Sequence, residues 1–158
     1  PELTRENVEA TFRTLHAARG VMFEDGVESV FRRLSWNYKT NSPWLFGKRV
    51  ILTRFKEKSA KAWDSYPCHS TASELDDLAR VLHVFDGKPE PDHRNGWYHR
   101  ATAAMKEQQD RAEDDYVSVR WFCNGNAHLT FKRLDLVDKM NRILASRYPA
   151  AIAFDGRG

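Results

Sequence analysis

The stretch Tyr116–Lys132, YVSVRWFCNGNAHLTFK, decides the fold of this chain. Apolar and polar residues alternate on both sides of Asn124-Gly125-Asn126, which predicts two antiparallel strands joined by a tight turn. One turn signal is enough for a hairpin, but this one has Asn, Gly, Asn and then His128 two residues later. The extra polar groups make the hairpin tip the first candidate for a functional site.

The apolar positions predict the register of the hairpin. A three-residue loop, Asn124 to Asn126, brings all the apolar pairs to one face, whereas a one-residue slip would move a whole set to the other face. Asn126 would then adopt the left-handed conformation, which Asn tolerates better than most residues. The predicted pairs are Cys123 with Ala127, Trp121 with Leu129, and Val119 with Phe131.

The other face of the hairpin would carry Arg120, Phe122, His128 and Thr130, with Phe122 opposite His128. An aromatic ring, an imidazole and a guanidinium on one exposed face suit the recognition of a planar or anionic ligand. We therefore treat His128, Asn124 and Asn126 as candidate catalytic residues. A simpler interpretation stays open, in which the asparagines serve the turn and His128 is a solvated strand residue.

The composition is that of an ordinary globular protein and predicts a single domain over residues 1–158. No apolar run approaches the roughly 20 residues of a membrane span. The cysteines, Cys68 and Cys123, form no metal-binding CxxC spacing and no disulfide framework, which suggests the reducing cytoplasm. A start without Met is compatible with a piece of a longer protein.

Positive charge is concentrated in one segment. From Arg32 to Lys61 nine basic residues stand against one acid, Glu57, although the whole chain carries a net charge of only +3. Basic side chains supply salt-sensitive affinity for nucleic acid, and aromatic residues can stack on unpaired bases. The alternative is a solvated face with core tryptophans. The candidate nucleic-acid-binding residues are Arg32, Arg33, Trp36, Tyr38, Lys39, Lys48, Arg49, Arg54, Arg120 and Phe122.

Hydrophobic periodicity predicts an α+β fold, in which a small antiparallel sheet that includes the hairpin packs with about five helices. One further strand is expected from Arg49 to Phe55, where β-forming residues dominate. The helices are expected at about Thr4–Arg19, from Asp25 past Leu34, from Ser73 to Phe85, from Trp97 to Ala112, and from Asp135 to Arg147.

Sequence templates for catalysis are mostly missing: the chain has no GxGxxG, no Walker loop, no GxSxG and no HExxH. The order strand–turn–strand–helix, with a histidine on a strand, loosely resembles the ββα metal nucleases. In that interpretation His128 would act with Asp138 or Asn141 of the following helix as a metal or general-base site. The sequence leaves the cofactor, if there is one, unknown.

Three segments resemble an uncharacterised bacterial domain family: LSWNYKTNSPWLFGKRVIL (Leu34–Leu52), LDDLARVLHVFDGKPEPDHRNG (Leu75–Gly96) and VRWFCNGNAHLTFKRLDLVDKMNRILA (Val119–Ala145). The family is catalogued as a domain of unknown function, occurs on plasmids, prophages and genomic islands, and is at times labelled methyltransferase-like. The resemblance implies a setting of DNA modification, restriction or its evasion. The residues themselves show no glycine-rich cofactor loop and no Asn/Asp-Pro-Pro-Tyr motif, so a methyltransferase would be a neighbouring segment or a partner protein.

Three hypotheses of function follow. In the first, the domain binds DNA or RNA through the basic and aromatic segment and the hairpin tip. In the second, it is a nuclease or phosphodiesterase that depends on His128 or a metal. In the third, it is a protein-interaction module that inhibits a host or phage defence factor. Among these, the sequence favours the first.

Overall fold

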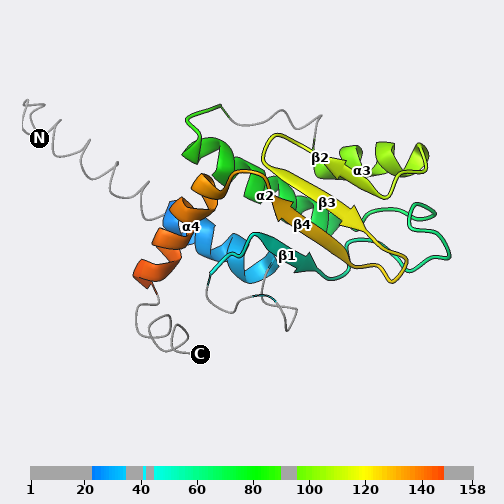
Figure 1. The fold of residues 1–158 in the computed structure, drawn as a ribbon, viewed down its shortest axis with the longest axis horizontal. Helices are drawn as coiled ribbons and strands as arrows, with labels where there is room; N and C mark the ends of the chain where they lie inside the picture. The colour runs from blue at the N-terminus through cyan, green and yellow to red at the C-terminus, as the bar shows by residue number, and fades with distance from the viewer. Residues whose placement is uncertain (1–22, 35–40, 42–44, 90–95, 148–158) are drawn as a thin grey trace, which may run out of the picture.

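The computed structural model describes residues 23–34, 41, 45–89 and 96–147, and it confirms the α+β class. Four strands form one antiparallel sheet in the order β1-β4-β3-β2 (Figure 1). They are β1 (Arg49–Leu52), β2 (Arg111–Glu113), β3 (Val117–Trp121) and β4 (Ala127–Phe131). Because β1 joins the outer edge of the hairpin, a segment far away in the sequence becomes the direct neighbour of β4.

The described residues contain four helices: one over residues 23–34, α2 (His69–Phe85), α3 (Trp97–Lys106) and α4 (Leu134–Arg147). Figure 1 shows α2 running across one side of the sheet. The helix predicted at Thr4–Arg19 lies outside the described residues. No helix of the described part of the chain has the length and apolar character needed to cross a membrane.

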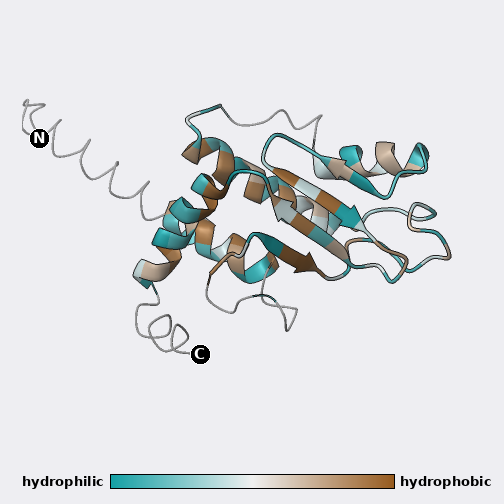
Figure 2. Ribbon diagram, in the orientation of Figure 1, coloured by the Kyte–Doolittle hydropathy of each residue, from teal (hydrophilic) through white to brown (hydrophobic). Residues whose placement is uncertain are grey.

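Strict alternation along the hairpin builds the core. One face of β3 and β4 is at most 2% exposed and carries Val117, Val119, Trp121, Ala127, Leu129 and Phe131. Phe55 stacks on Trp121 with ring centroids 5.4 Å apart, and Phe46 packs edge-on against Phe131. Figure 2 shows hydrophobic stripes on the helices as well as on the strands. The helices and the apolar strand positions therefore share one core.

The predicted faces of the hairpin are confirmed, but the predicted register is wrong by two residues. Trp121 pairs with Ala127, Val119 with Leu129, and Val117 with Phe131. A shift of two keeps every side chain on its face, so apolar matching cannot distinguish these two registers. The strands are joined by residues 122–126, in which Phe122 N donates to the Asn126 carbonyl and Gly125 N to the Phe122 carbonyl.

This register also corrects two single-residue predictions. The left-handed residue of the loop is Gly125, with φ +92°, rather than Asn126. Cys123 was expected on the apolar face, but it lies beyond the last pair of the ladder and is exposed.

Backbone turns set other boundaries that the sequence pattern missed. Strand β1 ends at Leu52 rather than Phe55 because Arg54 turns the chain with φ +56°. Helix α3 ends at Lys106 rather than Ala112, and Gln108, with φ +58°, redirects the chain into the short strand β2. Helix α2 begins at His69, four residues earlier than predicted. Its N-cap residue is Cys68, which has an extended backbone, and the Thr71 hydroxyl in the first turn donates to the Arg54 carbonyl.

Candidate functional site

Within the described residues, one face of the sheet is not packed into the core, and we call it the uncovered face. Two rows of side chains cross it, as given by the strand register. One row is Ile51, His128, Arg120 and Arg111, and the other is Arg49, Thr130, Ser118 and Glu113. The uncovered face thus joins two parts of the chain that the sequence singled out separately, the basic segment and the polar side of the hairpin.

Three arginines make the uncovered face positive. Arg111 and Arg120 share a single carboxylate, since their Nε atoms lie 3.2 and 3.3 Å from the two oxygens of Asp110. Within the described part of the chain, no carboxylate forms an ion pair with Arg49, which is exposed. Glu113 is matched by Lys132, whose Nζ lies 2.9 Å from the Glu113 carboxylate.

His128 lies among these cations. In the register it stands between Ile51 and Arg120, and its ring centroid is 4.7 Å from that of Phe122. The Arg120 guanidinium in turn lies 5.3 Å from the Phe122 ring centre. Partial burial, and then the charges of Arg49 and Arg120, lower the pKa of His128 below its ordinary value. Its imidazole is therefore neutral at neutral pH and can both donate and accept a hydrogen bond.

The hairpin tip docks on the loop that follows β1. The Gly125 carbonyl accepts hydrogen bonds from the backbone N–H groups of Phe55 (2.9 Å) and Lys56 (3.2 Å). Asn124 Oδ1 accepts from the backbone of Asn126 at 3.0 Å, which is a local turn bond. Part of the polar surplus at the tip is thus explained by the turn itself, as the simpler interpretation expected.

A groove of about 1110 Å³ opens beside the tip, and we call it the tip groove. It runs between the hairpin tip, the loop after β1 and the first turns of α2 and α3. Side chains that line it include Arg54, Lys58, Tyr66, His69, Tyr98, Asn124 and Asn126. Both asparagines line this groove, whereas His128, with which they were grouped, does not.

The remaining basic candidates have different surroundings. Arg32 and Arg33 are engaged in ion pairs, with Glu28 at 3.0 Å and with Asp77 at 3.1 Å. Lys48 is exposed beside Arg49, and its carbonyl accepts from the Phe131 backbone. Trp36, Tyr38 and Lys39 lie outside the described residues.

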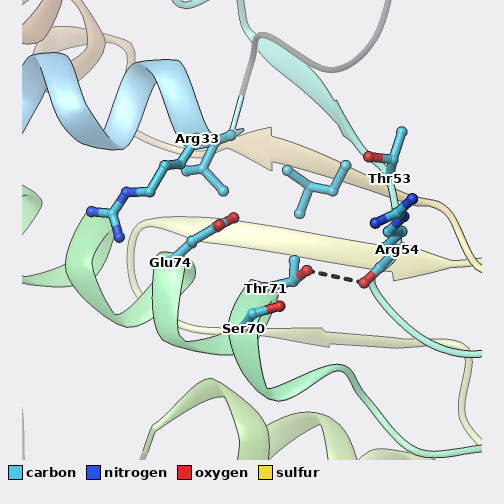
Figure 3. Close-up of a pocket in the computed structure, with 8 residues that line it drawn as sticks. Arg33, Thr53, Arg54, Ser70, Thr71 and Glu74 are labelled. Atoms are coloured by element: carbon cyan, nitrogen blue, oxygen red, sulfur yellow. Dashed lines mark hydrogen bonds between the residues drawn. The ribbon is translucent and has the colours of Figure 1, made fainter.

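A second, smaller cavity of about 170 Å³ separates Arg33 from Arg54 (Figure 3). Glu74 projects into it, and burial is the main reason why the pKa of this carboxyl is raised, while Arg33 acts in the opposite direction. The neighbouring Thr71 hydroxyl donates to the Arg54 carbonyl at 2.9 Å. Because the Glu74 carboxyl group projects into this cavity, the cavity is less suited to an anionic ligand than the uncovered face is.

Two residues were proposed to assist His128: Asp138 is exposed on α4, and Asn141 is engaged by the backbone. The Asn141 side chain binds the backbone of Phe46 twice, accepting from its N–H at 2.8 Å and donating to its carbonyl at 2.9 Å. Phe46 belongs to the core side of the sheet, whereas His128 lies on the uncovered face. Among the described residues, no three His, Cys, Asp or Glu side chains come close enough together to hold a metal ion.

The structure adds site residues that sequence reasoning missed. Arg111 was assigned to a helix, although it stands on β2 beside Arg120. His69 and Tyr98, which are 29 residues apart, stack face to face with ring centroids 3.8 Å apart and an interplanar angle of 8°. No local pattern marks such a pair. For Arg111 too no local pattern was available, because β2 has only three residues.

Cys68 stands at the start of α2 and also lines the tip groove. Its thiol lies 3.1 Å from the Ser70 hydroxyl. This side-chain hydrogen bond is the main reason why the pKa of the Cys68 thiol is lowered, and the backbone N–H groups of Thr71 and Ser70 act in the same direction.

Comparison with known proteins gives a family but no characterised relative. No curated protein and no solved structure matches the chain. One family model, described as a domain of unknown function (DUF4942), matches residues 1–150, which include both strands of the hairpin and all the described helices. This chain therefore belongs to the DUF4942 family.

Proposed function

We propose that this domain binds nucleic acid through the uncovered face of its sheet. The observation that supports the proposal is the grouping of Arg49, Arg111 and Arg120 from three strands. Asp110 pairs with the last two, and Glu113, the other acid of this face, pairs with Lys132. Asp110 partly neutralises Arg111 and Arg120, whereas no carboxylate of the described residues pairs with Arg49, so an anionic ligand would reduce the remaining repulsion. The charges of Arg49 and Arg120, after the larger effect of burial, also lower the pKa of His128.

The size of the face fits a polyanion better than a single small anion. Arg49 and Arg111 lie on the two outer strands, which are three strand spacings, about 14 Å, apart. Successive phosphates of a nucleic-acid strand are much closer together than this, so one strand could contact several arginines. Ser118 and Thr130 supply hydroxyl groups between them, which bind phosphate or base edges.

The biological setting that we propose is DNA modification, restriction or its evasion on plasmids, prophages and genomic islands, with a methyltransferase or a defence-system protein as a neighbour or partner. It is supported by the family resemblance of the three quoted segments and by the charge of the uncovered face, which suits a DNA or RNA ligand.

Charge reversal combined with a salt titration tests the proposal. Arg49→Glu and Arg120→Glu should each weaken binding of a fluorescent oligonucleotide at low salt by about tenfold or more, for all sequences alike. Each should also reduce the slope of log affinity against log salt by about 1. Arg142→Glu makes the same charge change at an exposed position of α4, which is not part of this face, and is the matched control. Wild-type affinity that does not change with salt would contradict the proposal.

A hydrolase is the second candidate, because the imidazole of His128 is held in the neutral form that accepts a proton. His128→Ala should then abolish hydrolysis of a single-stranded or duplex substrate assayed with Mg²⁺, Mn²⁺ or Zn²⁺, while the circular dichroism spectrum stays that of the wild type. Full turnover in this variant, or no turnover by the wild type with any of these metals, would remove the candidate.

A further inference from the structure

The tip groove contains an aromatic side chain that has no role in the core. Tyr66 is 72% exposed, the most exposed of the large hydrophobic residues in the described part of the chain. Its backbone is nevertheless fixed, because Lys56 and Pro67 form a β-bridge and Cys68 N donates to the Phe55 carbonyl at 2.7 Å. An exposed ring on a fixed backbone loses little entropy when a ligand stacks on it.

The stacked rings of His69 and Tyr98 form a second aromatic surface in the same groove. His69 is the first residue of α2 and Tyr98 the second residue of α3, so two helices hold the rings in place. Flat rings that are already in position suit bases, since every base has a π-face. The amide group of Asn126 in the groove adds a donor and an acceptor for base edges.

The charge of the tip groove is also suitable. Arg54 and Lys58 are both exposed, and within the described residues neither has an ion-pair partner. The groove also contains two acids, Glu57 and Asp64. The positive charge of nearby Lys56 offsets the negative charge of Asp64. Burial lowers the pKa of Lys56, and the charge of Asp64 acts in the opposite direction. The remaining balance is positive.

Residues of the uncovered face and of the tip groove follow one another along the hairpin tip. Phe122 lies on the uncovered face against His128, and Asn124, two residues later, already lines the groove. A strand that crosses the arginines could therefore continue past Phe122 into the groove. A duplex could follow the arginines, but its bases are paired and stacked inside the helix, so they could not reach the rings of the groove.

We infer that the tip groove binds unpaired bases, with Tyr66 as the stacking residue and with Arg54 and Lys58 on the phosphates. The domain would then prefer single-stranded nucleic acid or unpaired loops to duplex. This inference rests on the proposed function, because it needs a nucleic acid on the uncovered face, but it makes a separate claim about base pairing.

Fluorescence anisotropy with a single strand of about 12 nucleotides and its duplex tests the inference. The wild type should bind the single strand more tightly. Tyr66→Ala should weaken single-strand binding by about tenfold and leave duplex binding within about twofold. Tyr66→Phe keeps the ring and should stay within about twofold of the wild type. Val84→Ala, at an exposed apolar residue outside the groove, is the control, and thermal denaturation verifies that all variants are folded.

The outcomes separate the two proposals. If the wild type binds neither ligand, both proposals are wrong. If binding depends on salt and on Arg49 but Tyr66→Ala changes nothing, or weakens both ligands equally, the uncovered face remains and the groove inference is wrong. Duplex binding as tight as single-strand binding would also overturn the groove inference.

Discussion

Gly125 packs against the backbone of Lys56 so closely that a Cβ atom at position 125 would lie 2.6 Å from the Lys56 carbonyl oxygen. The same glycine has φ +92° and accepts two backbone hydrogen bonds from residues 55 and 56. This contact fixes the hairpin tip to the loop after β1. The hairpin tip and this loop both line the tip groove, so the contact also fixes the shape of the groove.

Replacing Gly125 should destabilise the protein strongly, because both the backbone conformation and the contact exclude a side chain. We expect Gly125→Ala to lower the free energy of unfolding by about 2–3 kcal/mol in urea denaturation. Gly26→Ala is the matched control, since Gly26 lies in the helix over residues 23–34 with nothing within 4 Å of the new Cβ. That variant should be more stable by about 0.5–1 kcal/mol. Equal effects of the two substitutions would contradict this account.

Tyr116 should make the stability depend on pH through Asp86. The hydroxyl of buried Tyr116 donates a hydrogen bond to Asp86 at 2.9 Å. This bond is the largest cause of the lowered pKa of the Asp86 carboxyl. In turn, burial above all, and then Asp86, raise the pKa of Tyr116 to about 12. A carboxyl whose folded pKa is lowered stabilises the fold above its unfolded pKa, about 4, and this stabilisation is lost as the pH falls through the folded pKa.

Tyr116→Phe should therefore lose stability at pH 7 and show a smaller further loss on acidification to pH 3 than the wild type. Urea denaturation at the two pH values measures the difference. Tyr98→Phe removes a hydroxyl that has no hydrogen bond within the described residues, and it should leave the pH dependence unchanged. The same acid sensitivity in Tyr116→Phe and the wild type would argue against the Tyr116–Asp86 bond.

The arginines beside His128 should be visible in its titration. Arg49→Gln or Arg120→Gln removes one of the charges that lower the pKa of His128, so the pKa should rise toward its ordinary value. The recovery should be partial, since burial is the larger cause and remains. Proton NMR of the imidazole measures the pKa. Arg142→Gln on α4 is the charge-matched control and should leave it unchanged; an unchanged pKa in the two test variants would place Arg49 and Arg120 too far away to matter.

How far the fold could be predicted depended on the kind of information that each element requires. The alternation of apolar and polar residues decides which face of the hairpin is buried, and Val119 and Leu129 are buried as this alternation predicts. The same alternation cannot decide between registers that differ by two residues. In the observed register Gly125 docks on Lys56, which lies 69 residues earlier in the chain, and such a long-range contact leaves no local pattern. The short strand β2 has too few residues to show any period.

The candidate site was predictable only where the participating residues lie close together in the sequence. Arg120, Phe122 and His128 share a face because of the hairpin, so their grouping could be inferred. The position of Arg49 beside Thr130 depends on which strand joins the hairpin edge, which is a long-range choice. The tip groove needs Tyr66 and His69 from one segment and Tyr98 from another, and no spacing rule connects the two segments.

If the uncovered face binds nucleic acid, the binding should depend on pH through His128. In the free protein the pKa of His128 is lowered by burial and by Arg49 and Arg120. A phosphate beside the ring favours the imidazolium, so the pKa should be higher in the complex and binding should take up a proton. Affinity should then increase as the pH falls through the bound-state pKa and level off below the free-state pKa.

Anisotropy titrations from pH 8 to pH 5.5 at constant ionic strength measure this dependence. His128→Gln keeps a polar side chain that cannot titrate, so its affinity should stay flat over the range while its binding at pH 8 stays close to that of the wild type. His99→Gln changes an exposed histidine on α3, away from the uncovered face, and should keep the wild-type slope. If the slope persists in His128→Gln and disappears in His99→Gln, the ligand contacts a different part of the surface and the arginines of the sheet are not its binding site.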